Sequence, residues 1–181
     1  MSETYVALLR GINVGGANKL PMKELAALFA AAGAKDGRTY IQSGNVVFKA
    51  TGHVVAHLAN TISEAIEEGF GLKVPVLLRS RAELEAVLDA NPFVDRGSNP
   101  KAFHVMFLSD HPSDERVAAL GPQRSPPDEF AVLGREVYLH CPKGIARSKL
   151  TTAWIDRALG TVATVRNWNT VNALVEMCRA S

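Results

Sequence analysis

The chain has 181 residues, of which 47% are hydrophobic and 21% are charged, which is typical of an ordinary folded globular protein. This length predicts one large domain or two small ones, with enough apolar surface to form a core without disulfides. The formal net charge of +2 is too small to single out nucleic acid or any other anionic partner.

The cysteine spacing and the N-terminal residues indicate the cellular compartment in which we expect the protein. Cys141 and Cys178 are far apart and form no CxxC motif, so neither a disulfide framework nor a zinc site is predicted. Residues 1–20 lack the basic start and apolar run of a secretion signal, and no run of about 18 apolar residues occurs that would span a membrane. We expect a cytoplasmic protein with reduced thiols, no membrane partner and no bound metal.

The first half of the chain predicts two strand–helix–strand units. Short apolar runs indicate strands, and apolar residues at every third or fourth position indicate helices. The predicted elements are a strand over 5–9, a helix from Met22 to Gly33, strands over 39–42 and 45–49, a helix over 54–70 and a strand over 74–78. With right-handed crossovers, this βαββαβ order places both helices on one face of an antiparallel sheet, the ferredoxin-like arrangement.

The second half predicts the same order again. A helix over 82–90 ends at Asn91-Pro92, and the polar residues 95–101 are the predicted linker. The elements that follow are a strand over 103–108, a helix over 113–120, strands over 129–133 and 136–140, a helix over 151–159, a strand over 162–165 and a helix over 171–178. No residue-level repeat is visible. We therefore predict an α+β protein of two ferredoxin-like subdomains, residues 1–94 and residues 102–181 with a terminal helix, each an antiparallel sheet with helices on one face.

A glycine-rich segment, LLRGINVGG, follows the first predicted strand. It matches neither the phosphate-loop pattern GxxxxGK[ST] nor GxGxxG, so no nucleotide fingerprint is present. Gly11, Gly15 and Gly16 nevertheless permit positive φ angles that turn backbone amides toward an anion, and Arg10 adds a bidentate donor. The alternative is a tight turn, with Arg10 in a structural ion pair.

Two further segments combine arginine with small polar residues. In RTYIQSGN, Arg38, Ser43 and Asn45 surround a glycine turn, but the topology leaves open whether this turn meets the glycine-rich segment. Arg79 ends VPVLLR as Arg10 ends YVALLR, and these strands are predicted neighbours. We expect both guanidinium groups at one sheet edge, neutralised by an anion or by nearby carboxylates.

The segment TVRNWNT precedes the last predicted helix. Arg166 has the wrong charge for a helix N-terminus, which favours a carboxylate or phosphate partner there, and the asparagines can cap the helix. The complete predicted ligand-binding set is Arg10, Gly11, Asn13, Gly15, Gly16, Arg38, Ser43, Asn45, Arg79, Arg166, Asn167 and Asn169. No catalytic residue, cofactor fingerprint or metal-ligand pattern is identified.

Five motifs in this order, LLRGINVGG, MKEL, TYIQSGNVVF, NPF and RNWNT, closely resemble a mostly bacterial family known as domain of unknown function 1697. The resemblance extends from Tyr5 to about Met177. It implies two ferredoxin-like α+β subdomains and supplies no activity. It marks the motif positions as signature residues of the family and gives none of them a catalytic role.

The combination of arginine, asparagine and glycine at the ends of elements predicts a site for a small anionic or nucleotide-like ligand. One alternative is a nucleic-acid-binding module whose sheet displays Tyr5, Tyr40 and Phe48 for base stacking. Another is a protein-interaction module without catalytic activity. Whether the protein is an enzyme stays open, because arginine, asparagine and serine can stabilise a charged transition state but no general base stands out.

Overall fold

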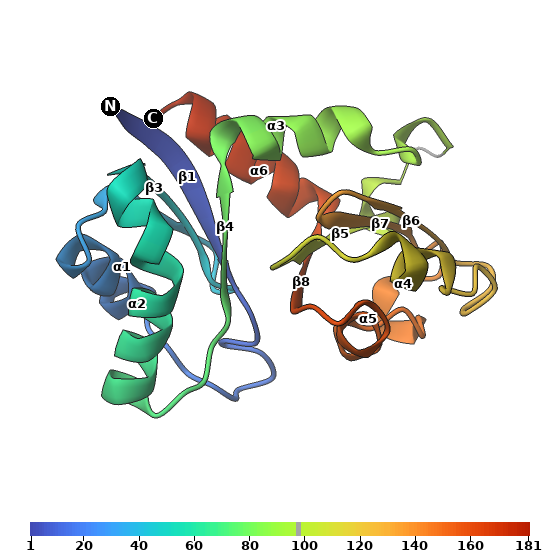
Figure 1. Ribbon diagram of the computed structural model, residues 1–181, viewed down its shortest axis with the longest axis horizontal. Coiled ribbons are helices and arrows are strands. Elements are labelled where there is room, and N and C mark those ends of the chain that lie inside the picture. Colours follow the sequence, from blue (N-terminus) through green and yellow to red (C-terminus); the bar gives the residue numbers. More distant parts are fainter. Residues whose placement is uncertain (97–98) are drawn as a thin grey trace. The chain divides into compact units, whose positions relative to one another are not determined.

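The computed structural model describes residues 1–96 and 99–181, which form two compact units (Figure 1). The first unit contains Met1–Glu85 and Leu174–Ser181, and the second contains Ala86–Ala173. Residues 97 and 98 of the predicted linker lie outside the described residues. The domain boundaries at residues 94 and 102 stay a prediction.

The first unit contains a four-stranded antiparallel sheet in the order β2-β3-β1-β4. Its elements are β1 (Ser2–Leu9), α1 (Met22–Ala31), β2 (Lys35–Tyr40), β3 (Asn45–Thr51), α2 (Gly52–Phe70) and β4 (Val76–Ser80). Helices α1 and α2 cover one face of this sheet (Figure 1). This confirms the ferredoxin-like arrangement predicted from the element order.

The second unit repeats the topology with the sheet order β6-β7-β5-β8. Its elements are the 3-10 turns Val94–Arg96, Pro100–Ala102 and Ile145–Arg147, together with β5 (Phe103–Leu108), α4 (Asp114–Ala118), β6 (Glu129–Leu133), β7 (Glu136–His140), α5 (Thr152–Leu159) and β8 (Ala163–Asn167). A helix follows the last strand of each sheet: α3 (Arg81–Ala90) after β4, and α6 (Trp168–Arg179) after β8. The α+β class with two similar sheets is therefore confirmed.

The apolar periodicity of the helices accounts for the core of the first unit. Leu58, Ile62 and Ile66 recur every four residues along α2 and are completely buried. They belong to a cluster that also contains Phe29 of α1 and Phe48 of β3. Burying these side chains provides the main favourable contribution to folding, at about 1.5–3 kcal/mol for each large apolar residue.

Several strand boundaries differ from the prediction, and two of the differences affect candidate site segments. The strand expected over 39–42 runs from Lys35 to Tyr40, because Ile41 adopts a φ of +49° and starts a turn. The strand expected over 74–78 runs from Val76 to Ser80. Arg79 therefore lies inside a strand, opposite Val6 of β1, and does not follow the strand's end.

A residue-level repeat relates the two units, although the sequence analysis detected none. Arg79 and Arg166 are each the fourth residue of the last strand of their sheet, and both are buried. Each Nη1 donates a hydrogen bond to the carbonyl of the preceding residue, at 2.9 and 2.8 Å. The next residues, Ser80 and Asn167, each accept a hydrogen bond from the backbone amide three positions later. The two strand–helix junctions are thus built in the same way.

Gly44 provides a test of the packing at the end of the first sheet. It has a φ of +77°, and an added Cβ would lie 2.8 Å from Leu9 Cβ and 2.9 Å from Ile12 Cδ1. We expect Gly44→Ala to lower the free energy of unfolding by about 1–3 kcal/mol, measured by urea denaturation. Gly37→Ala is the control, because nothing lies within 4 Å of its added Cβ. Equal losses in the two variants would contradict the packing described.

Candidate functional site

The glycine loop, defined here as residues 10–20, meets the hairpin turn, defined as residues 41–44. The antiparallel register pairs Asn45 with both Leu8 and Tyr40, which brings the end of β1 beside the turn between β2 and β3. The amide of Leu9 donates to the carbonyl of Gly44 at 2.8 Å. The question that the sequence left open is therefore answered: the two segments lie at the same end of one sheet.

Asn13 joins the glycine loop to the hairpin turn. Its Nδ2 donates to the carbonyls of Leu20 and Gln42, both at 2.9 Å, and its Oδ1 accepts from the amide of Leu20 at 2.9 Å. Both ends of the side-chain amide are thus used inside the protein. Asn13 fixes the geometry of the site and is poorly placed to contact a ligand itself.

The glycine loop ends in a small exposed hairpin. Val14 and Ala17 form an antiparallel bridge, and the amide of Ala17 donates to the carbonyl of Val14 at 3.0 Å. Gly15 and Gly16 lie between them with φ angles of +57° and +79°, as the two central positions of a type I′ turn require. Gly15 and Gly16 therefore form a tight turn, which was the alternative to anion binding considered for this segment.

Asn18 is a structural residue of this loop that the sequence analysis missed. Its Nδ2 donates to the carbonyl of Gly11 at 2.8 Å, and its carbonyl accepts from the amide of Asn13 at 3.0 Å. The available signal was its residue type, because asparagine tolerates the left-handed conformation that Asn18 adopts, with a φ of +49°.

The backbone of the glycine loop is unusual over eight residues. Positive φ angles occur at Gly11, Asn13, Gly15, Gly16 and Asn18. Within residues 1–96 and 99–181, no group accepts a hydrogen bond from the amides of the three glycines. An added Cβ at any of the three would meet nothing within 4 Å. The space in front of these glycines is open, so their conformation, and not crowding, is what requires glycine.

Ser43 and Asn45 brace the hairpin turn from beneath. Asn45 is completely buried, and its Nδ2 donates to the carbonyl of Tyr40 at 3.1 Å and to Ser43 Oγ at 2.9 Å. Above them, Ile41 is half exposed with a φ of +49°, which is rare for a β-branched residue. The hairpin turn is therefore held in a strained conformation by buried polar contacts.

Arg10 and Arg79 do not share a sheet edge, so that expectation is wrong. Since β1 and β4 are antiparallel, their C-terminal ends point in opposite directions. Arg10 follows β1, and its amide donates to the carbonyl of Pro75 at 3.0 Å, just before β4 begins. Arg79 lies opposite Val6, toward the other end of the strand pair, and is only 1% exposed.

Arg38 closes the C-terminal end of α6. It is an exposed residue of β2, and its Nη2 donates to the carbonyl of Met177 at 2.9 Å and to Ser181 Oγ. Carbonyl groups of the last turn of a helix lack partners within the helix and carry partial negative charge, so an arginine stabilises them. This contact gives Arg38 a structural role.

The remaining candidates, Arg166, Asn167 and Asn169, belong to the second unit. Arg166 lies inside β8 and not at the helix N-terminus, and its Nη1 donates to Thr164 Oγ1 at 2.9 Å. Burial lowers the pKa of Arg166 to about 10, so its side chain stays cationic at neutral pH. Asn167 Oδ1 accepts from the amide of Thr170 at 2.8 Å, which is the expected capping contact, and Asn169 is exposed on α6.

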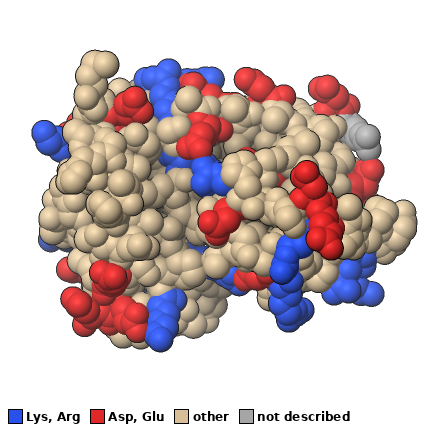
Figure 2. Space-filling view, viewed as in Figure 1, with Lys and Arg blue, Asp and Glu red and all other residues tan. Residues whose placement is uncertain are grey.

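The aromatic residues proposed for base stacking do not form an exposed surface. Phe48 is 1% exposed and lies 5.3 Å from Phe29 and 5.9 Å from Tyr5, measured between ring centroids. Its ring is therefore part of the core under α1. On the molecular face shown in Figure 2, basic and acidic side chains are interspersed. A nucleic-acid partner stays an untested alternative, without support from these aromatics.

The described residues also bear on metal and membrane binding. In these parts of the chain, no group of three or more histidine, cysteine, aspartate or glutamate side chains could hold a metal ion. Of the helices described, none is both long and apolar enough to cross a membrane. Cys141 and Cys178 are buried free thiols, and burial raises the pKa of each to about 11.

Comparison with known proteins shows the family. The family model described as "Protein of unknown function (DUF1697)" matches residues 2–138. The chain belongs to this family. A similar solved structure is that of the conserved bacterial protein SP0830 from Streptococcus pneumoniae, with 21% identity and a TM-score of 0.75, over 98% of this chain and 99% of that one. At that identity the likeness shows the fold alone. No curated protein matches the chain.

The raised thiol pKa values give a prediction for pH dependence. A thiol whose pKa is higher in the folded state keeps its proton better when folded, so its contribution to stability is present below pH 9 and is lost as the pH rises toward 11. We expect slow reaction of Cys141 and Cys178 with iodoacetamide at pH 8, and fast reaction in 8 M urea. Fast modification of the folded protein, followed by mass spectrometry, would contradict their burial.

Removing the Asn13 side chain tests the link between the two segments. Asn13→Ala breaks three hydrogen bonds, so we expect the free energy of unfolding to fall by about 1–3 kcal/mol in urea denaturation. Amide hydrogen exchange at Leu20 should also become faster. Asn169→Ala is the control, since this exposed side chain should change stability by no more than about 0.5 kcal/mol. A similar small effect for Asn13→Ala would refute the bridging role.

Proposed function

We propose that this protein binds a small anion, such as phosphate or the phosphate group of a nucleotide, at the glycine loop. The observation that carries the proposal is the loop backbone, with positive φ at five positions and the amides of Gly11, Gly15 and Gly16 without an acceptor in the described chain. Amides in such turn conformations form concave sites that favour anions.

The bracing of the loop supports the same proposal. Non-glycine residues in the left-handed region cost about 1–3 kcal/mol each and persist only where surrounding contacts hold them. Asn13, Asn18 and Ile41 are three such residues, all in the glycine loop or the hairpin turn. A loop already held in one conformation loses little entropy when a ligand binds, which favours affinity.

We assign different roles to residues of the predicted set. Arg10 stands at the entrance of the glycine loop and would add a charge-assisted donor to the loop amides. Asn13, Ser43 and Asn45 would act as positioning residues, because their side chains are hydrogen-bonded within the loop and the turn. Arg38 is excluded from the proposed anion contacts, because it caps a helix.

A protein-interaction surface is the second candidate function, and a specific observation favours it. Val14 and Ile41 are 64% and 50% exposed, one on the glycine loop and one on the hairpin turn. Exposed apolar side chains on two adjoining segments are suited to contact another protein. The cytoplasmic location expected from the sequence stays a prediction and is part of either proposal.

Calorimetric titration with inorganic phosphate, pyrophosphate and ATP tests anion binding. We expect saturable binding of at least one of the three, and a loss of affinity of about tenfold or more in Arg10→Ala, as removal of one charge-assisted hydrogen bond predicts.

Lys35→Ala is the matched control, because it removes the same charge from an exposed position at the opposite end of the same sheet. Its affinity should equal that of the wild type. The proposal fails if none of the three anions binds, or if the two variants weaken binding equally.

A further inference from the structure

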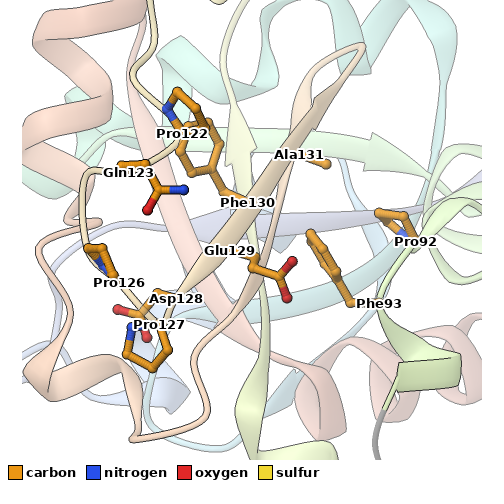
Figure 3. A pocket seen from close by; sticks show the side chains of 10 residues that line it. All are labelled: Pro92, Phe93, Pro122, Gln123, Pro126, Pro127, Asp128, Glu129, Phe130 and Ala131. Atoms are coloured by element: carbon orange, nitrogen blue, oxygen red, sulfur yellow. The ribbon is translucent and has the colours of Figure 1, made fainter.

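A second candidate site lies in the second unit and includes the family motif NPF. A cavity of about 550 Å³ is lined by residues 92–93, 122–123 and 126–131 (Figure 3). This volume lies within the range of roughly 300–1,000 Å³ that is usual for small-molecule sites. The proposed anion site uses none of these residues.

Proline and aromatic side chains share the cavity lining with polar groups. Asn91 Oδ1 accepts a hydrogen bond from the amide of Phe93 at 3.0 Å, which turns the chain after α3 and brings Pro92 and Phe93 to the cavity. The Phe93 ring is 5% exposed and stacks on His140, with ring centroids 6.1 Å apart. Pro122, Pro126, Pro127 and Phe130 complete the apolar part of the lining, and the φ angles of the three prolines are fixed by their rings.

The cavity lining also contains a carboxylate, of which one oxygen is hydrogen-bonded within the protein. Asp128 is 9% exposed, and its Oδ2 accepts a hydrogen bond from Ser125 Oγ at 2.7 Å. In the described parts of the chain, no group donates to Oδ1, and no lysine or arginine forms an ion pair with this side chain. Oδ1 is not one of the buried atoms that lack a partner, so a positively charged ligand can reach it and form a charge-assisted hydrogen bond.

Glu129 adds a second carboxylate to the lining. Its Oε2 lies 3.3 Å from Nδ1 of His140, the same ring on which Phe93 stacks. In Figure 3 the carboxylate of Glu129 and the ring of Phe93 lie beside each other. The lining thus combines two acidic side chains with aromatic and proline surfaces, and it contains no lysine, arginine or histidine.

We propose that this cavity binds an organic cation, meaning a primary ammonium or guanidinium group on an apolar stem. The charged group meets a carboxylate of the lining, with Asp128 as the main partner, and the stem packs on the aromatic and proline side chains of the lining, where cation–π attraction adds to the apolar contact. A free amine and the lysine side chain of a peptide share this chemistry. A metal ion fits poorly, because the described side chains supply no cluster of three ligands.

Benzylamine is the first probe, titrated into the ¹⁵N-labelled full chain. We expect saturable shifts confined to amides at residues 93, 123 and 128–131 (prolines carry no amide). Benzyl alcohol has the same shape without the charge and should bind at least tenfold more weakly. Equal binding of the two probes would overturn the cationic specificity.

Asp128→Asn is the decisive variant, because it retains an acceptor for Ser125 and removes the charge. We expect its affinity for benzylamine to fall at least tenfold, and Glu129→Gln to show a smaller loss. Glu136→Gln is the matched control, as it removes a carboxylate from the same hairpin at a position outside the cavity lining. Unchanged binding in a folded Asp128→Asn protein would refute the proposal, and Glu129→Gln provides the test if that variant does not fold.

Two further titrations distinguish a free amine from a peptide lysine as the source of the cation. A short acetylated peptide containing lysine is compared with the same peptide containing norleucine. Preference for the lysine peptide supports capture of a peptide side chain, whereas binding of benzylamine alone supports a free amine. Shifts of the same amides by Mg²⁺ or Ca²⁺ at equal concentration would overturn the proposal. Arg10→Ala should leave benzylamine binding unchanged, which separates this site from the anion site.

Discussion

The antiparallel pairing of β1 with both β3 and β4 decides where the candidate residues of the first unit lie. Because Leu8 pairs with Asn45, the first residue of β3, the chain leaves β1 next to the hairpin turn between β2 and β3. Because Leu9 pairs with Val76, the same exit also contacts the residue before β4, where Arg10 donates to the Pro75 carbonyl. The pairing equally separates Arg10 from Arg79, since the C-terminal ends of antiparallel neighbours point apart.

At this end of the sheet, one side chain connects the two segments. Asn13 forms three hydrogen bonds, each with a net value of about 1 kcal/mol, and these are comparable with the cost of a few left-handed residues. The arrangement therefore tolerates strain, and among the described residues it leaves the amides of three loop glycines without an acceptor. In a fold whose family has no assigned activity, this unusual backbone is the most specific feature of the first unit.

Much of the fold could be predicted because its signals are local. The strands over 103–108, 129–133 and 136–140 have the predicted bounds. The first is a continuous apolar run, and the other two flank the Gly134-Arg135 turn. The element order was also sufficient to infer both sheets. The predicted end of the strand over 39–42 was wrong because the positive φ angle of Ile41 ends the strand at Tyr40.

The candidate site could be predicted only in part, because its contacts connect distant residues. Arg38 donates to Met177, 139 positions away, and no local pattern reveals such a contact. The burial of Arg79 and Arg166 and their shared junction also became visible only once strand registers were known. Residue type alone made all four of the arginines in the predicted set look like ligand contacts, although most have structural surroundings.

The central claim is that amides of the glycine loop bind an anion directly. A titration of the ¹⁵N-labelled protein with inorganic phosphate, followed through the amide signals of Gly11, Gly15 and Gly16, tests it most directly. We expect saturable downfield shifts of these three signals, with smaller changes at Gly37 in the same unit. If the three signals stay in place while phosphate is raised to saturating concentration, or if all glycine signals shift alike, the glycine loop is a turn and not a binding site.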